Sequence, residues 1–470
     1  MSAAETCLAD AVELGRRIRT REQSAVEVLE AHVAQIARVD RDVGAIVTLA
    51  VERAHDEARA ADVALARGET TGALHGLPVA VKDSVDTAGI RTTCGTGAFA
   101  ERVPEHDAAS VRRLRAAGAI VFAKTNLPEL AAGTYTDNAL FGPTRNPYAL
   151  DRTCGGSSGG SAVAVSCGMA PLALGTDMAA SLRNPASCCN VVGLRPAPGR
   201  VPEGTPTRWP PYSVTGPLAR TARDTGLLLS VLADAPDAAG RDPARFAGPL
   251  ERDFAGVRVA LGTDVGGLPF EPEARTWRDA ASTALRALGC EVRECEPDLS
   301  GADEAFELWR AWAFEHQWGA LVDSSGDAVH ATIRWNVAEG RRLTVRDLVR
   351  AERCRLAVVA RARAFMEVHE LLLLPVNQTL PGDVRERTPP AIDGVPMASY
   401  LEPMRSCSRI TVTGLPAISA PCTFSANGLP IGVQIVGRPG GELALLQLAH
   451  ALEQLTDTAT LRPVRAACMP

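Results

Sequence analysis

The residues best suited to proton transfer in this sequence are its two lysines. Of the 49 Lys and Arg residues, only Lys82 and Lys124 are lysines. Arginine keeps its charge in proteins, whereas a buried lysine can lose its proton and act as a base. An arginine-rich genome explains the overall ratio. The two positions that kept lysine are still candidates for chemistry or for a specific structural contact.

A glycine-rich loop supplies serines on which such a base could act. Residues 155–159 read GGSSG and match the G-x-S-x-G elbow, which would make Ser157 the nucleophile of an esterase. An elbow follows a strand directly, but residues 147–154 (PYALDRTC) are polar and turn-like. The same glycines could cradle a phosphate, although no Gly-Lys-Ser/Thr follows them. A structural loop without chemistry is the third interpretation.

Both lysines stand where predicted strands end. Apolar runs at residues 77–81 and 119–123 predict buried strands that end at Lys82 and Lys124. Asp107 is expected to cap a helix between them. Strand, helix and strand in this order predict an α/β sheet.

The same alternation continues along the chain. A capping box of Ser24 and Glu27 predicts the start of a helix, and a second helix is expected at residues 52–67. After the glycine-rich loop, residues 171–177 (PLALGTD) are expected to form a strand. Further strands are predicted at 257–261, 371–374, 417–422 and 432–436, and helices at 273–288 and 442–453.

A mainly helical pattern interrupts the α/β alternation at residues 300–370. It contains four of the six tryptophans: Trp309, Trp312, Trp318 and Trp335. We expect one domain over residues 1–470, in which this segment is an insertion. It either covers the active site or packs an ordinary apolar helix face against the body.

Composition excludes several classes of protein. The net charge of −6 and the pI near 5.9 give no basic surface for nucleic acid or a membrane. No apolar stretch reaches the ~18 residues of a spanning helix, and the first residues lack a secretion signal. The twelve cysteines form no C-x-x-C pairs, so neither a metal site nor a disulfide framework is indicated. We expect a cytoplasmic protein.

One long string identifies a family. Residues 155–186, GGSSGGSAVAVSCGMAPLALGTDMAASLRNPA, resemble the signature of the amidase signature family of serine hydrolases. The resemblance continues in GLPVAVKD, AKTNLPEL, FGPTRNP, VVGLRP, GLPAISAPC and GLPIGVQIVGRP, and is weak only between about residues 220 and 370. It implies an α/β fold with a central mixed β-sheet flanked by helices.

The resemblance also implies a catalytic triad. It assigns the nucleophile to Ser181, the bridging serine after a cis peptide bond to Ser157, and the catalytic lysine to Lys82. A serine hydroxyl is a weak nucleophile until a neighbour accepts its proton, and a neutral Lys82 would accept it through Ser157. Burial lowers a lysine pKa enough for this role. Lys124 is assigned to structure, because no nucleophile motif is in register with it.

The loop before Ser181 departs from the family pattern. Its backbone N–H groups are expected to form the oxyanion hole, contributed by Met178, Ala179, Ala180 and Ser181. Relatives usually have two glycines at the places of Ala179 and Ala180, and alanine disfavours positive φ. Three further residues are expected to support the loops: Ser158, Asp177 and Arg183.

The resemblance implies a hydrolase that cleaves the C–N bond of a small amide or carbamate (a urethane) without a cofactor or metal. Ester hydrolysis is expected as a side activity, and a homodimer is compatible with the family. One alternative is the glutaminase-type subunit of a tRNA-dependent amidotransferase. Another is a catalytically weak binding protein, suggested by the Ala179–Ala180 pair.

Overall fold

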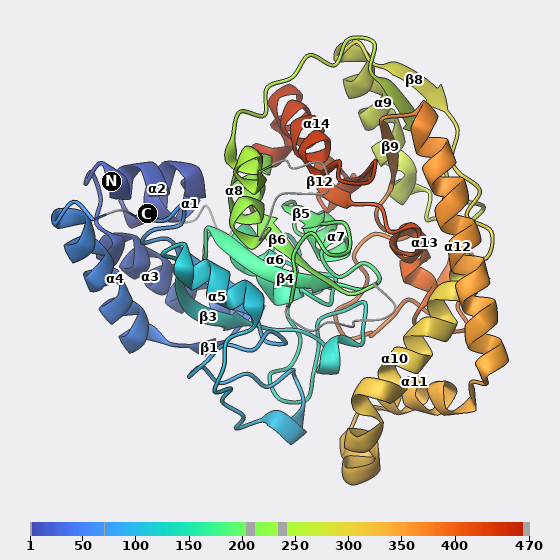
Figure 1. Cartoon of the computed structure of the whole chain (residues 1–470), viewed down its shortest axis with the longest axis horizontal. Coiled ribbons are helices and arrows are strands. Elements are labelled where there is room, and N and C mark those ends of the chain that lie inside the picture. Colours follow the sequence, from blue (N-terminus) through green and yellow to red (C-terminus); the bar gives the residue numbers. More distant parts are fainter. Residues whose placement is uncertain (1, 70, 204–211, 234–241, 464–470) are drawn as a thin grey trace.

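The core of the structure is an eleven-stranded mixed β-sheet (Figure 1). The computed structural model describes residues 2–69, 71–203, 212–233 and 242–463. Within these residues the strands of the sheet are β1 (Ile46–Leu49), β2 (Pro78–Lys82), β3 (Ile120–Thr125), β4 (Leu172–Asp177), β5 (Val192–Arg195), β6 (Val214–Ala219), β7 (Arg258–Leu261), β8 (Glu291–Glu294), β9 (Leu371–Pro375), β12 (Ala417–Phe424) and β13 (Pro430–Gly437). Their order is β1-β3-β2-β4-β6-β5-β12-β13-β9-β7-β8. The predicted α/β fold with a central mixed sheet is confirmed.

Helices cover both faces of the sheet because its strands are apolar on both sides. On β2, Val79 and Val81 belong to one apolar cluster and Ala80 to another, as the alternation of a strand requires. The first cluster includes residues of α2 (Ala11–Arg19), α5 (Ala109–Ala116), α8 (Ala222–Leu232), α9 (Trp277–Ala287) and α14 (Glu442–Leu455). The second includes residues of α3 (Ala25–Val43), α4 (Val51–Ala66), α6 (Gly159–Ser166) and α7 (Arg183–Cys188).

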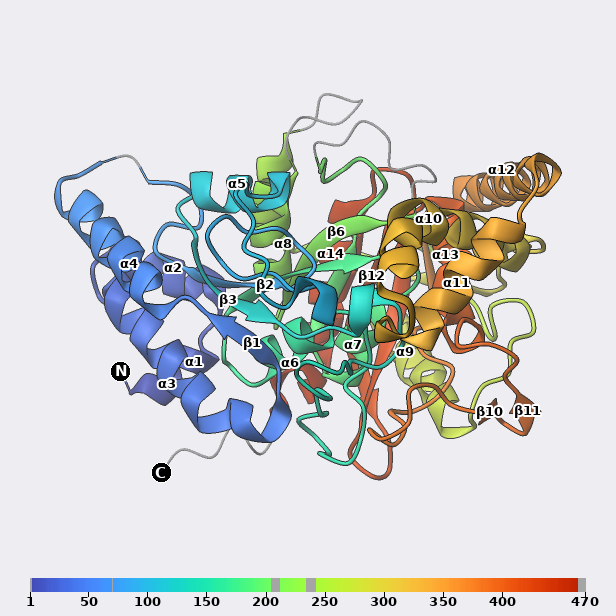
Figure 2. The same ribbon diagram turned by 90° about the horizontal axis from the view of Figure 1, so that it is seen from below.

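Three long helices fill the segment that was expected to be helical. They are α10 (Ala302–Ser325), α11 (Ala331–Arg342) and α12 (Val345–Val368). With α13 (Arg405–Thr413), α10 and α12 pack against Leu372 and Leu374 of β9 in a third apolar cluster. Figures 1 and 2 show these helices at the opposite end of the molecule from the helices α1 (Ala3–Leu8) to α4. A separate short hairpin consists of β10 (Ala391–Ile392) and β11 (Val395–Pro396).

Of two N-cap residues predicted from the sequence, the structure confirms one and contradicts the other. Ser24 caps α3 in a capping box with Glu27, as predicted. The prediction that Asp107 caps a helix is wrong, because the N-cap of α5 is Ala108. The Asp107 carboxylate instead accepts a hydrogen bond from the Ala88 backbone and pairs with Arg115. The Asp107 side chain is thus used in contacts with Ala88 and Arg115 and does not cap the helix.

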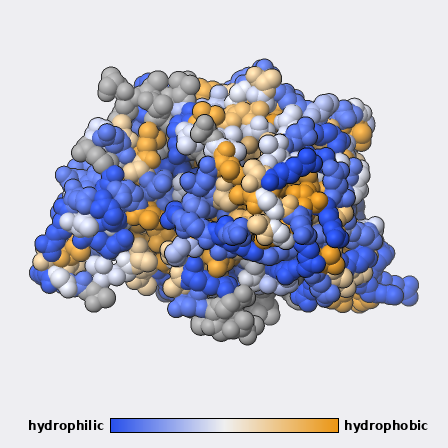
Figure 3. Space-filling view, turned by 90° about the horizontal axis from the view of Figure 1, so that it is seen from above, coloured by the Kyte–Doolittle hydropathy of each residue, from blue (hydrophilic) through white to orange (hydrophobic). Residues whose placement is uncertain are grey.

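On the face shown in Figure 3, apolar side chains form separate patches between broad polar areas. Within the described ranges, no helix combines the length and hydrophobicity needed to cross a bilayer.

Candidate active site

The site forms where two parallel strands end side by side. β2 and β4 pair in parallel, with Val81 opposite Leu174. Their carboxyl ends therefore meet at one edge of the sheet, which brings Lys82, the last residue of β2, next to the end of β4. The glycine-rich loop comes to the same edge, because Ser157 lies just before α6.

A chain of hydrogen bonds joins the three expected triad residues. Lys82 Nζ lies 2.7 Å from Ser157 Oγ, and Ser157 Oγ lies 2.9 Å from Ser181 Oγ. Lys82 also contacts Ser158 Oγ and Thr176 Oγ1, each at 3.0 Å. The peptide bond between Gly156 and Ser157 is cis. The structure thus brings together the side chains that the sequence separates by up to 99 positions.

The environment of Lys82 favours the neutral amine. Its side chain is fully buried, and its hydrogen-bond partners are three hydroxyl groups. Burial lowers the pKa of Lys82 to about 7, although the negative charge of Asp177 acts in the opposite direction. Burial therefore shifts the balance at this position toward the uncharged amine.

Counting hydrogens gives this network a direction. The Ser158 hydroxyl donates its single hydrogen to the Thr176 carbonyl at 3.1 Å, so it accepts one from Lys82. A neutral amine has two N–H donors and one lone pair. When the donors point to Ser158 and Thr176, the lone pair faces Ser157. The arrangement can then move a proton from Ser181 to Ser157 while the proton of Ser157 moves to Lys82.

The loop at residues 178–181 presents backbone donors beside Ser181. Within the described residues, the N–H groups of Ala179, Ala180 and Ser181 have no hydrogen-bond acceptor. Ala179 and Ala180 are buried, and neither has a positive φ. Their methyl groups belong to the same apolar cluster as Tyr212. The backbone conformation at these two positions therefore does not require glycine.

A network of buried charged side chains contacts the loop at residues 178–181. Asp177 accepts from Arg183 Nη2 at 3.0 Å and from the backbone N–H of Leu182 at 3.1 Å. Arg195 also contacts it, at 3.3 Å. Burial disfavours the carboxylate, but the two arginine charges outweigh it and hold the pKa of Asp177 at about 2. Arg183 donates to the Ala179 carbonyl at 2.7 Å, which ties the network directly to the loop.

A comparison with known families agrees with this geometry. The model of the amidase family matches residues 27–446. The chain belongs to the amidase signature family. The prediction made from the motifs is confirmed over almost the whole chain.

Curated relatives in the family include amidotransferase subunits. A glutamyl-tRNA(Gln) amidotransferase subunit of Moorella thermoacetica is 34% identical over 488 aligned residues, which cover 96% of this chain and 97% of the relative. The corresponding subunit of Thermosynechococcus vestitus is 33% identical, with 96% and 98% covered.

Solved structures of the family include enzymes with other names. A bacterial aryl acylamidase superposes with a TM-score of 0.90 at 26% identity, covering 98% of this chain and 99% of its own. A 6-aminohexanoate cyclic dimer hydrolase gives 0.87 at 28% identity, with 99% of both chains covered. The glutamyl-tRNA(Gln) amidotransferase subunit of Thermotoga maritima gives 0.75 at 27% identity, with 96% and 95% covered. This amidase signature chain therefore shares its fold with these enzymes over nearly its whole length.

Sequence reasoning did not identify three residues that hold the site. Thr176 contacts Lys82, and Arg195 contacts Asp177. The Asn184 side chain donates to the Gly156 carbonyl at 3.3 Å. Thr176 and Asn184 lie inside the signature string, which was the available signal. Arg195 lies on β5, in the separate family motif VVGLRP, and its contact with Asp177 is seen only in the tertiary structure.

Lys124 forms buried hydrogen bonds with residues that follow β2. Its Nζ donates to Thr87 Oγ1 at 3.0 Å and to Thr92 Oγ1 at 2.9 Å. These hydrogen bonds connect β3 to the segment that follows β2. Within the described ranges, no group of three His, Cys, Asp or Glu side chains is arranged to hold a metal ion.

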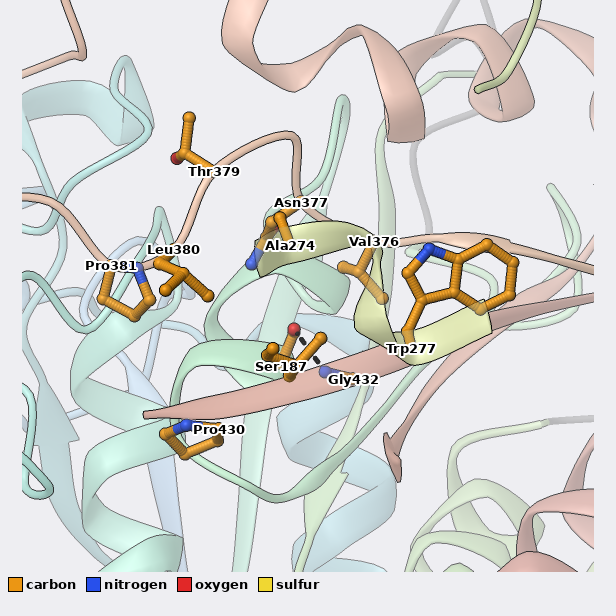
Figure 4. Close-up of a pocket in the computed structure, with 11 residues that line it drawn as sticks. Ser187, Ala274, Trp277, Val376, Asn377, Thr379, Leu380, Pro381, Pro430 and Gly432 are labelled. Carbon is orange, nitrogen blue, oxygen red and sulfur yellow. Dashed lines mark hydrogen bonds between the residues drawn. The ribbon is translucent and has the colours of Figure 1, made fainter. Parts of the chain in front are cut away.

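A small pocket is lined by residues other than the triad. Figure 4 shows Ser187, Trp277 and Asn377 on its wall, and Ser187 Oγ accepts a hydrogen bond from the Gly432 backbone at 2.9 Å. The cavity measures about 10 Å³, which is room for about one water molecule. It is too small to bind a substrate, and none of the three triad residues lines it.

Proposed function

We propose that this protein hydrolyses the C–N bond of a small amide through an acyl-enzyme on Ser181. The observation that carries the proposal is the hydrogen-bonded chain from Ser181 through Ser157 to a buried Lys82. The pKa of Lys82, lowered to about 7 by burial, supports its role as the base of a mechanism that needs no histidine.

In the first half of the reaction, the Ser181 oxygen forms a bond to the substrate carbonyl carbon. Its proton passes to Ser157, and the proton of Ser157 passes to Lys82, which becomes an ammonium. The C–N bond then breaks, and the leaving amine takes a proton back from Lys82 through Ser157. Water attacks the acyl group by the same relay and releases the acid.

The loop at residues 178–181 serves as the oxyanion hole in this proposal. The N–H groups of Ala179, Ala180 and Ser181, which have no acceptor within the described ranges, would donate to the negative oxygen of the tetrahedral intermediate. Arg183 and Asp177 fix the loop, and Ser158 orients Lys82. The ordinary backbone angles of the two alanines favour an active enzyme over a silent binding protein.

The helices α10 and α11 are proposed to form one wall of the substrate site within a single amidase domain. Phe314, Trp318 and Ile333 share an apolar cluster with Met178 of the loop. Trp335 is partly exposed and packs against Tyr400 instead. The tryptophans of the segment therefore do not line one common aromatic pocket.

The substrate class divides into two candidates. High structural similarity to enzymes named acylamidase and cyclic dimer hydrolase supports an independent hydrolase of amides or carbamates, with esters as further substrates. Higher sequence identity to amidotransferase subunits supports a glutaminase that works with partner subunits. These relatives give no support to the expectation that nucleic acid is excluded as a partner.

A substrate panel with mass spectrometry distinguishes the candidates. The purified chain is incubated with amides, carbamates, esters and glutamine, and the acyl adduct is located by peptide mapping. We expect turnover of a primary or aryl amide and an adduct on Ser181. Glutamine hydrolysis that appears only after amidotransferase partner subunits are added would support the glutaminase. An adduct on Ser157 alone, or no labelling of Ser181 by a fluorophosphonate, would contradict the proposed mechanism.

The pH dependence of the reaction should report the Lys82 base. The amine must be neutral to accept a proton, so kcat/KM should fall about tenfold per pH unit below about pH 7 and level off above it. Initial rates between pH 5 and 9 at constant ionic strength measure this profile. A flat profile, or a rate that decreases as the pH rises through 7, would show that the active form is not the neutral amine.

A further inference from the structure

Arg310 is a buried arginine without a carboxylate partner in the described part of the chain. It lies on α10, and only 3% of its surface is exposed. The buried Arg183 and Arg195, in contrast, both contact Asp177. A charged group removed from water is costly unless an opposite charge compensates it. Among the residues that the structure describes, no carboxylate therefore balances the positive charge of Arg310.

Within the described residues, Arg310 has two hydrogen-bond partners, and both are uncharged. Its Nε and Nη2 donate to the Tyr400 hydroxyl at 3.2 and 2.7 Å, and Asn336 donates to the same hydroxyl at 2.7 Å. Its Nη1 faces the thioether sulfur of Met178 at 3.1 Å. A hydroxyl has two lone pairs and a thioether is a weak acceptor, whereas a guanidinium has five N–H groups. Some of its donors are therefore available to a ligand.

Arg310 lies beside the proposed oxyanion loop. Met178 is the first residue of that loop, three positions before Ser181. The guanidinium also lies 4.3 Å from the ring centroid of Phe314, which shares an apolar cluster with Met178. Met178 and Tyr400 are only half-buried. The two side chains that contact the guanidinium are therefore themselves partly open to solvent.

We propose that Arg310 binds a carboxylate of the substrate, so that the preferred substrates are amides that carry an anionic group. The guanidinium fork matches a carboxylate in two parallel hydrogen bonds, and the surrounding apolar residues strengthen the attraction. Arg310 acts here as a specificity residue, and this inference rests on the proposed amide hydrolysis. The carboxylate belongs either to the acyl part of the substrate or to its amine part.

Matched substrate pairs test the preference and locate the carboxylate. The monoamides of succinic, glutaric and adipic acid are compared with butyramide, valeramide and hexanamide, in which a methyl group replaces the carboxylate. N-acetylglycine is compared with N-ethylacetamide for the amine part. In one of the two series we expect kcat/KM to be about 10- to 100-fold higher for the charged member. Equal rates for both members of every pair would overturn the inference.

Two variants separate recognition from structural support. Arg310→Met should reduce the ratio of kcat/KM for the charged substrate to kcat/KM for its neutral partner to about one, mainly through KM. Arg310→Lys should restore part of this ratio. Tyr400→Phe is the matched control, because it removes the present acceptor and leaves the guanidinium in place. It should keep the preference for the charged member. If Arg310→Met lowers kcat/KM for both members of each pair by the same factor, Arg310 is a structural residue and the inference is wrong.

A binding measurement keeps this test independent of turnover. In the Ser181→Ala background, calorimetry compares glutaramate and N-acetylglycine with their neutral partners. We expect at least one charged compound to bind about tenfold tighter than its partner, and Arg310→Met to abolish the difference. If turnover is absent but this difference is present, the proposed function fails and the anion site stands. If no charged compound binds more tightly, the anion site is refuted.

Discussion

Replacing Ser181 by alanine is expected to lower kcat by about 10⁴-fold or more on every substrate that the wild type hydrolyses. The methyl group has no oxygen to attack the carbonyl, and Ser157 Oγ loses its neighbour at 2.9 Å. Alanine can adopt the same backbone angles as serine, so the fold should remain intact. Single-turnover rates and mass spectrometry for the acyl adduct provide the measurement.

Ser187→Ala is a suitable control for this variant. Ser187 lies on α7, close in sequence to Ser181, but its hydroxyl accepts a hydrogen bond from the Gly432 backbone. The loss of this hydroxyl should reduce the free energy of unfolding by about 1 to 3 kcal/mol, while kcat stays close to the wild-type value. Should Ser181→Ala retain a normal rate, or should both variants lose activity equally, Ser181 is not the nucleophile.

The strands of the site could be predicted from sequence because their signals are local. Residues 77–81 and 171–177 are apolar runs that end in polar residues, and the structure places β2 and β4 there. The edge strands had weaker signals. β1 is short, and β8 alternates charged residues at Glu291 and Arg293, which suits a solvent-facing edge more than a buried run. Neither was predicted.

The position of the three candidate residues came from the resemblance, whereas their support depends on long-range contacts. No periodicity indicates that Arg195 would reach Asp177, or that Arg183 would contact Thr411 and Gln434. These partners come from β5, α13 and β13, which meet only when the sheet is assembled. A buried charge depends on its partners in space, so composition and spacing cannot specify it.

The same limitation applies to the alanine pair in the loop. From sequence, the family pattern of two glycines suggested a backbone with positive φ that alanine would disturb. In the structure both alanines have ordinary backbone angles, and their side chains pack in a cluster with Tyr212 and Phe306. Their acceptability depends on local φ values and on neighbours that are distant in sequence.

Replacing Lys82 by methionine is expected to lower kcat by about 10³-fold or more, because methionine retains the length of the side chain but has no proton acceptor. Removing a fully buried amine also ends the dependence of the rate on a group with a pKa near 7. The residual rate of Lys82→Met should therefore be almost independent of pH between 6 and 8. Pre-steady-state acylation rates across this range measure both effects.

Lys82→Arg separates a base from a fixed positive charge. Arginine keeps the charge but stays protonated, so it should be as inactive as methionine if Lys82 acts as a base. If the arginine variant retains a rate near that of the wild type, then the role of position 82 is electrostatic, and Ser157 must lose its proton to another group. Thermal unfolding at pH 8 is the control for folding, because the hydrogen-bond partners of Lys82 are three neutral hydroxyl groups and a permanently charged guanidinium is costly to bury among them. An inactive but folded arginine variant, together with the pH-independent residual rate of Lys82→Met, leaves proton transfer as the remaining explanation for a buried lysine at this position.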